Sequence, residues 1–132
     1  MSIRIVRLGS ERARHEGTRI GTVRHPPRGV PKDRHAAENW YDVWLPELAP
    51  SAELVKSGRA AESPREWAAF VKRYRAEMAA PEKEHLLRLL AAMSRDVNFS
   101  VGCYCADESR CHRSVLRELL VEHGANVATA HI

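Results

Sequence analysis

The segment that decides the fold is VNFSVGCYCADESRCHRSVLRELLVEHG, residues 97–124. In residues 97–105 apolar side chains alternate with polar or small ones, the apolar set being Val97, Phe99, Val101, Cys103 and Cys105. A period of two residues is typical of a β-strand. The segment therefore begins with a predicted strand that ends near Cys105.

The second part of the segment predicts an amphipathic helix. Val115, Leu116, Leu119 and Leu120 recur at helical spacing, and Gly124 supplies a C-terminal cap. Residues 125–132 read as a further short strand. A strand, a helix and a second strand form a βαβ unit, so the predicted class is α/β: a small, partly parallel sheet flanked by helices in a single layered domain.

The remainder of the chain divides into strands near the N-terminus and helices in the middle. Apolar pattern, proline, glycine and capping residues predict strands at 2–8 and 18–24, a Pro/Gly loop at 25–33, and helices at 37–45, 52–57, 64–78 and 82–94. Ser63 and Glu66 form a capping box at the start of the third helix. We interpret residues 1–132 as one domain with a basic part (1–35), a helical middle (36–95) and the βαβ part (97–132).

Composition is that of a folded chain of ordinary hydrophobicity. Hydrophobic residues make up 44% of the 132 residues, and neither a signal peptide nor an apolar run long enough for a membrane span is present. We therefore expect a cytoplasmic protein without membrane contact. Three cysteines in that compartment are expected to be reduced, and an odd count does not fit a disulfide framework.

Positive charge is concentrated in the N-terminal quarter. Residues 1–35 carry nine basic and three acidic side chains, a net charge of +6, whereas the rest of the chain has a net charge of −2. Arginine outnumbers lysine seventeen to four, which suits bidentate contacts with phosphate or carboxylate but also follows from a GC-rich genome. The charge suggests two kinds of partner: an anionic small molecule, or a nucleic acid bound by the basic quarter.

The turn between the last strand and helix, residues 105–114, is the predicted ligand site. Ligands bind at the carboxyl ends of strands in open α/β sheets, and a helix N-terminus offers free N–H groups to an anion. Arg113 and Ser114 add donors there, and Arg24, which directly precedes the Pro/Gly loop, and Arg28 within it are expected to face them. Cys105 or His112 is the predicted reactive group of a hydrolase or transferase, if the chain is an enzyme.

The clustered thiols allow several interpretations. Zinc could bind Cys103, Cys105, Cys111 and His112, but Cα atoms two residues apart on a strand are about 6.6 Å apart, wide for one ion. A Cys105–Cys111 disulfide or a thiol redox sensor requires an oxidant. A catalytic Cys105 thiolate would be stabilised by the helix N-terminus. Cys103 and Cys111 also suit core packing, and His112 a capping role. No metal or cofactor is predicted.

Four stretches of the chain resemble one known family. They are GTRIGTVRHPPRG (17–29), APSAEL with Trp44 (49–54), EWAAFVKRYRAEM (66–78) and CYCADESRCHRSVLRELL (103–120). Across residues 3–123 the chain resembles the domain of unknown function 488, in its YeaO-like branch, and other branches carry the same cysteine-rich ending. The resemblance implies a small α/β domain and no established reaction.

The resemblance also marks polar positions. Arg24, Arg28, Arg73, Tyr74 and Glu77 match positions that recur in the family, which makes them candidate ligand-binding residues. Residues 73, 74 and 77 are one turn apart on a predicted helix, where Arg73 and Glu77 could pair. The family usually has Asp before Arg24 and Trp before Pro27, whereas this chain has valine and proline at those positions.

Overall fold

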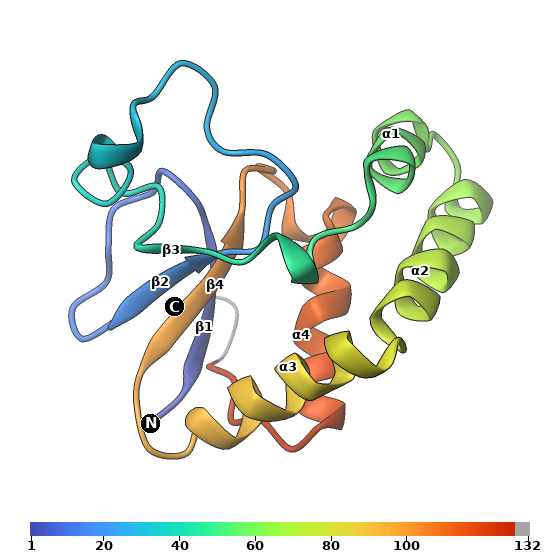
Figure 1. The fold of residues 1–132 in the computed structure, drawn as a ribbon. Helices are drawn as coiled ribbons and strands as arrows, with labels where there is room; N and C mark the ends of the chain where they lie inside the picture. Colours follow the sequence, from blue (N-terminus) through green and yellow to red (C-terminus); the bar gives the residue numbers. More distant parts are fainter. Residues whose placement is uncertain (129–132) are drawn as a thin grey trace.

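The computed structural model describes residues 1–128, which form a parallel sheet covered by helices (Figure 1). The strands are β1 (Ile3–Arg7), β2 (Thr18–Gly21), β3 (Val43–Trp44) and β4 (Phe99–Cys103), in the spatial order β1-β4-β2-β3. The helices are α1 (Ala52–Ala60), α2 (Pro64–Met78), α3 (Pro81–Met93) and α4 (His112–Glu122), and short 3₁₀ turns occupy Lys32–Arg34, Pro46–Leu48 and Glu108–Arg110. Each strand pair is parallel. The predicted α/β class is confirmed.

Strand β4 is the centre of the sheet. It pairs with β1 on one side and with β2 on the other, and all five of its residues are buried. Phe99 and Val101 belong to the main hydrophobic core together with residues of α2, α3 and α4. Figure 1 shows these helices gathered on one side of the sheet. Burial on both faces is what a central parallel strand requires.

A buried ion pair occupies the opposite face of the sheet. The Glu16 carboxylate accepts hydrogen bonds from the Arg19 guanidinium at 2.8 and 3.1 Å and from the Ser100 hydroxyl at 2.6 Å. Arg19 also donates to the carbonyls of Ser10 and Asn39. The two charged side chains are 2% and 0% exposed, so each depends on the other for its compensation.

The helix starts follow their capping residues. The Ser63 hydroxyl accepts a hydrogen bond from the Glu66 N–H at 3.1 Å, and the Glu66 carboxylate accepts one from the Glu62 N–H. Ser63 therefore caps α2 as predicted, whereas the Glu66 carboxylate accepts from the Glu62 N–H and the Ser63 hydroxyl rather than from the Ser63 N–H that a capping box would use. Ser51 caps α1 by accepting from the Leu54 N–H.

Gly58 does not end α1, contrary to the prediction of a helix over 52–57. The helix continues to Ala60, and Gly58 lies against the ring of Phe70 on α2. A Cβ atom at position 58 would lie 2.8 Å from that ring. The glycine therefore permits close packing of α1 on α2 rather than marking a helix end.

We predict that Gly58→Ala destabilises the protein by about 1–3 kcal/mol, because the added methyl must displace the Phe70 ring. Helix propensity alone predicts the opposite sign, a gain of about 1 kcal/mol. Thermal or urea unfolding measures the difference, with Ser57→Ala at the exposed neighbouring position as the control. An increase in stability on Gly58→Ala would contradict the close packing of the two helices.

The predicted helix over 37–45 is wrong. Residues 35–39 form turns, Asn39 has a positive φ of 63°, and Val43 and Trp44 form the edge strand β3. Tyr41 packs over Gly21 of β2, where a Cβ atom would lie 2.4 Å from its ring. The four-residue spacing of the tryptophans suited a helix, but pairing with β2 and packing of Tyr41 override that local pattern.

The ends of two predicted strands also differ from the structure. Strand β2 ends at Gly21 and β4 at Cys103, so Cys105 lies beyond the sheet. Of the predicted strand 125–132, Val127 forms one parallel bridge with Ile3, and residues 129–132 lie outside the described part.

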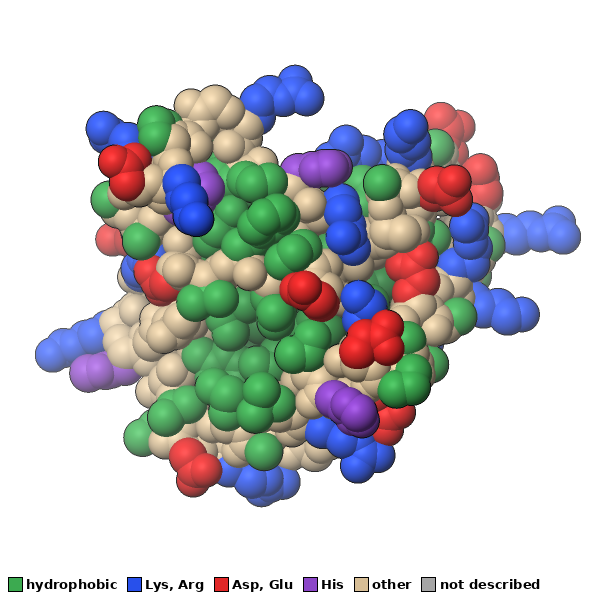
Figure 2. All heavy atoms as spheres, in the orientation of Figure 1, with side chains coloured by type: hydrophobic (Ala, Val, Ile, Leu, Met, Phe, Trp, Pro, Cys, Tyr) green, Lys and Arg blue, Asp and Glu red, His purple; other side chains and the backbone are tan. Residues whose placement is uncertain are grey.

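Hydrophobic side chains are exposed on part of the surface. Figure 2 shows hydrophobic side chains over the centre of one face with charged side chains around them, and the exposed hydrophobic residues of β3 are Val43 and Trp44. Among residues 1–128, no helix has the length and apolar character that crossing a membrane would require.

Candidate functional site

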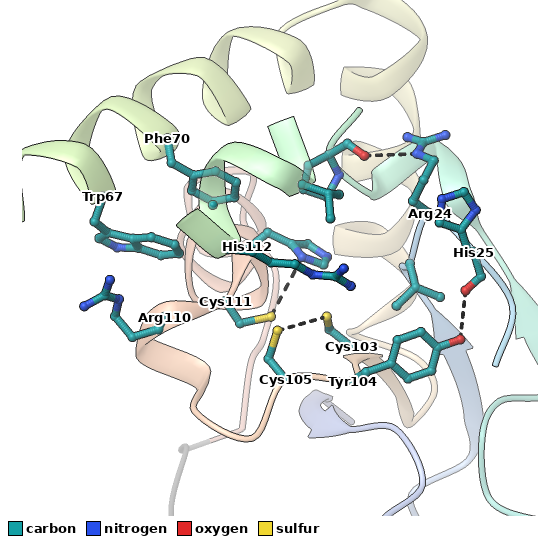
Figure 3. Close-up of a pocket in the computed structure, with 15 residues that line it drawn as sticks. Arg24, His25, Trp67, Phe70, Cys103, Tyr104, Cys105, Arg110, Cys111 and His112 are labelled. Carbon is teal, nitrogen blue, oxygen red and sulfur yellow. Dashed lines mark hydrogen bonds between the residues drawn. The ribbon is translucent and has the colours of Figure 1, made fainter. Parts of the chain in front are cut away.

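A pocket of about 140 Å³ opens at the carboxyl edge of the sheet, between the end of β4, the start of α4 and helices α1 and α2 (Figure 3). The residues that line it are Val23, Arg24, His25, Pro50, Val55, Gly58, Arg59, Trp67, Phe70, Cys103, Tyr104, Cys105, Arg110, Cys111 and His112. The pocket lies beside the turn that joins β4 to α4, where the sequence predicts a ligand site.

The three thiols converge at the floor of the pocket. Because β4 ends at Cys103, the chain turns at Tyr104, and the Sγ atoms of Cys103 and Cys105 lie 3.8 Å apart. Cys111 is the N-cap residue of α4, and its Sγ lies 3.8 Å from Nδ1 of His112. Cys103 and Cys111 are buried, whereas Cys105 is exposed. Cys105 is therefore the thiol that a molecule in the pocket can reach.

His112 is held in one orientation. Its Nε2 lies 2.7 Å from the carbonyl oxygen of Thr22, and its ring packs edge-on against Tyr74. Burial lowers the pKa of His112 to about 4, against a smaller opposing effect of the Thr22 carbonyl. The neutral ring must donate from Nε2 to that carbonyl, which leaves the Nδ1 lone pair directed towards the thiol cluster.

The thiols differ in their proton affinity. Hydrogen bonds from Cys103 and Cys111, together with the nearby His112 and Arg113, lower the pKa of Cys105 well below its ordinary value. Hydrogen bonding to Cys105 raises the pKa of Cys103, and hydrogen bonds to both other thiols raise that of Cys111. One negative charge shared by the cluster would therefore reside on Cys105.

The outer wall of the pocket is aromatic. Trp67 and Phe70 of α2 stack with their ring centroids 4.7 Å apart. The guanidinium of Arg110 lies 5.4 Å from the Trp67 ring and donates to the Ala61 carbonyl at 2.8 Å. These rings and Val55 offer apolar contacts to a bound molecule.

The rim of the pocket is basic. Arg24, Arg59 and Arg110 line it together with His25, and none of the described lining residues is acidic. The Arg24 guanidinium donates to the carbonyls of Pro50 and Ala49 at 3.0 Å each, which fixes its position while leaving it without an ion-pair partner among the described residues. The charge of the rim favours an anion.

Several residues predicted for the site lie elsewhere. Arg28 borders a neighbouring hollow with Arg7, Trp40 and Tyr104 rather than this pocket. Arg73 is exposed on α2. Tyr74 is fully buried, and its hydroxyl donates to the Leu48 carbonyl.

The expected pairing of Arg73 with Glu77 is replaced by another contact. The Glu77 carboxylate accepts a hydrogen bond from the Ser51 N–H at 2.9 Å, at the start of α1. Glu77 therefore joins α2 to α1, and the structure places it outside the pocket lining.

Arg113 and Ser114 contact the backbone. The Arg113 guanidinium is buried and donates to the carbonyls of Val6, Cys103 and Cys105 at 2.7, 3.4 and 2.8 Å. The Ser114 hydroxyl donates to the Cys111 carbonyl. Arg113 thus fixes the end of β1 and the cysteine loop, and does not itself line the pocket.

The basic N-terminal quarter is partly neutralised by ion pairs. Arg12 pairs with Asp42, and Arg34 pairs with Glu38. Arg19 is buried with Glu16. The net charge of this segment therefore overstates the free positive charge it can offer to a nucleic acid.

A family model described as "Active DUF488-N3 subclade" matches residues 3–124. The chain belongs to the DUF488 family. No curated protein and no solved structure matches it. The match covers the sheet, all four helices and the whole pocket of this DUF488 protein.

Some pocket residues were not identified from the sequence, because their apolar pattern is typical of core packing as well as of a pocket wall. Trp67 and Phe70 belong to the apolar stripe of α2, which predicts core packing equally well. Arg59 carries no signal in its local sequence. The geometric objection to a joint role for Cys103 and Cys105 assumed an extended strand through both residues, whereas β4 ends at Cys103.

Proposed function

We propose that this DUF488 protein is a thiol-dependent enzyme that acts on a small anionic molecule with an apolar part. The observation that carries the proposal is the position of Cys105, the exposed thiol at the floor of a basic-rimmed, aromatic-walled pocket. Cys105 acts as the nucleophile. The matching family model is described as an active subclade, which supports a catalysed reaction in this part of the family.

The size of the pocket limits the substrate. A cavity of about 150 Å³ holds a benzene ring, and this pocket measures about 140 Å³. A nucleotide would not fit within the pocket alone and would extend into the neighbouring hollow, which shares His25, Arg59 and Tyr104 with it. The substrate class is therefore a compact molecule whose apolar part contacts Trp67 and Phe70 and whose anionic group faces the Arg24 side of the rim.

The covalent step is a nucleophilic substitution. The Cys105 thiolate forms a bond from sulfur to the electrophilic atom of the substrate, and the leaving group departs with its bonding electrons. Water as co-substrate then releases the transferred group in a hydrolase, or a second acceptor does so in a transferase. The thiolate is restored in either case.

A pair of matched alkylating reagents tests this proposal in metal-free, reduced protein. Iodoacetate is small and anionic, and iodoacetamide is its neutral counterpart. The measured quantity is the rate constant for alkylation by iodoacetate divided by that for iodoacetamide. We expect this ratio to be at least about 10-fold higher for Cys105 than for free glutathione, because the arginine rim concentrates anions. In the alkylation, the S–C bond forms as iodide leaves with the C–I electron pair.

Two variants and a competing anion test whether the preference for iodoacetate arises in the pocket. Arg24→Gln is expected to reduce the preference for iodoacetate, and benzoate is expected to slow it competitively, whereas the exposed α2 variant Lys72→Gln leaves it unchanged. Peptide mass spectrometry identifies the modified thiol. A preference equal to that of glutathione, or alkylation insensitive to Arg24→Gln and benzoate, contradicts an anion-binding thiol site.

A further inference from the structure

We infer that Cys103, Cys111 and His112 form a binding site for a thiophilic divalent cation, zinc in the first instance, with Cys105 as the fourth ligand. The Sγ atoms of Cys103 and Cys111 and a ring nitrogen of His112 all lie within 4.8 Å of one another, and all three residues are buried. Sulfur and imidazole nitrogen are the donors that zinc prefers.

The spacing of these donor atoms matches a tetrahedron. Two sulfur atoms that are each about 2.3 Å from one tetrahedral zinc ion lie about 3.8 Å apart. The Sγ atoms of Cys103 and Cys105 are 3.8 Å apart, as are Sγ of Cys111 and Nδ1 of His112. Two contacts therefore already have about the length of tetrahedral edges, and Cys105, which is outside the group of Cys103, Cys111 and His112 whose donor atoms all lie within 4.8 Å of one another, would complete the set by moving its sulfur towards them when the cation binds.

The second nitrogen of His112 supports the same conclusion. A histidine that binds a metal donates its other ring N–H to a carbonyl or carboxylate, which fixes the tautomer and the ring orientation. Nε2 of His112 has this contact with the Thr22 carbonyl at 2.7 Å, and Nδ1 faces Cys111 (Figure 3). The Thr22 carbonyl therefore leaves the Nδ1 lone pair free to act as a ligand.

The turn after β4 makes the site possible. Cys103 is the last residue of the strand, so the chain can turn at Tyr104 and bring the Cys105 sulfur back beside it. Arg113 holds this turn by donating to the Cys103 and Cys105 carbonyls. The cation would lie at the back of the pocket, with Cys105 on the side that faces the bound molecule.

This inference deepens the proposed function, and rests on it only for the role of Cys105. A thiol that coordinates zinc is held deprotonated, which is the state in which Cys105 attacks a substrate. The metal would then supply the charge that keeps the nucleophile ready at the floor of the pocket.

Cobalt(II) is the spectroscopic probe for this site. We expect the reduced full chain to bind one equivalent of Co²⁺, with thiolate-to-cobalt charge-transfer bands in the near ultraviolet and the visible bands of tetrahedral cobalt, and Zn²⁺ should displace it. Cys111→Ser and His112→Gln should each weaken binding by more than about 10-fold. The exposed α3 variant His85→Gln should bind as the native chain does.

A measurement on the native chain avoids dependence on buried variants. X-ray absorption at the zinc edge should show three sulfur neighbours at about 2.3 Å and one nitrogen at about 2.0–2.1 Å. Cys105→Ser should remove one sulfur neighbour and keep the other ligands. Sub-stoichiometric cobalt binding, or sulfur-free coordination in the native chain, overturns the site.

The two proposals fail separately. If cobalt does not bind but Cys105 of the metal-free protein prefers iodoacetate, the cation site is overturned and the thiol enzyme is supported. If cobalt binds with the expected spectrum but the preference for iodoacetate is absent, the cation site is supported and the anion-directed role of Cys105 is overturned.

Discussion

Glu16→Gln is expected to lower the free energy of unfolding by about 3–5 kcal/mol, the range measured when one partner of a buried ion pair is removed. The glutamine keeps the shape of the side chain but not its charge, which leaves the Arg19 guanidinium buried without a counter-ion. Arg19 is 0% exposed and cannot turn towards water without leaving the sheet face. Because a domain has a total stability of about 5–15 kcal/mol, this one change removes a large part of it.

The effect of Glu16→Gln should depend on pH with a definite sign. Burial alone would raise the pKa of Glu16, but hydrogen bonds from Arg19, Ser100 and the Ala13 N–H together lower it to about 2. The unfolded chain has the ordinary value of 4.5. The contribution of the charged carboxylate is therefore fully present above about pH 4.5 and is lost as the pH falls towards 2.

Urea unfolding of the native chain and of Glu16→Gln across this pH range measures both effects. The matched control is Glu11→Gln, an exposed glutamate in the same segment, which is expected to change the stability by less than about 0.5 kcal/mol. A difference between Glu16→Gln and the native chain that stays constant from pH 6 to pH 2.5 would show that charge is not the source of the stabilisation.

The sequence alone was sufficient for the central strand and the last helix, because each has a pattern with one periodicity. Alternation over 97–105 has period two, and Val115 to Leu120 follow the helical period, so strand β4 and helix α4 were both predicted. The strand nevertheless ends at Cys103. Continued alternation cannot show where hydrogen bonding to β1 and β2 stops.

The failure at 37–45 has a different cause. Trp40 and Trp44 have the spacing of one helix face, but Val43 and Trp44 pair with β2, and Asp42 accepts a hydrogen bond from the Arg19 N–H. These partners lie more than twenty residues earlier in the chain. A contact of that range leaves no periodic signal in the segment itself.

The candidate site shows the same division between local and distant information. Its place at the strand-to-helix turn follows from local pattern, whereas the alternation placed Cys105 with the apolar residues of the strand, and its exposure follows from the end of β4 at Cys103. Arg24 reaches the pocket because the carbonyls of Ala49 and Pro50 accept hydrogen bonds from its guanidinium. Arg113 does not reach the pocket because its guanidinium donates to the Val6 carbonyl of β1. Neither partner could be named before the strands were ordered.

Arg113→Lys is the second change for which we expect a large effect, a loss of about 3 kcal/mol in the free energy of unfolding. Hydrogen bonds to charged groups contribute about 1.5–3 kcal/mol each, and the guanidinium donates to three carbonyls, those of Val6, Cys103 and Cys105. A lysine ammonium keeps the charge but lacks the planar fork that reaches β1 and the cysteine loop together. Its burial would also be less well compensated.

The same change should disturb the pocket, because the Cys105 carbonyl loses the donor that holds its loop. We expect Arg113→Lys to lower the unfolding midpoint in urea and to reduce the preference of Cys105 for iodoacetate over iodoacetamide, although Arg113 does not line the pocket. Arg65→Lys, at an exposed position of α2, should change neither. Loss of stability with an unchanged preference would mean that the position of Cys105 is set by the thiol cluster itself, and that Arg113 acts only through the end of β1.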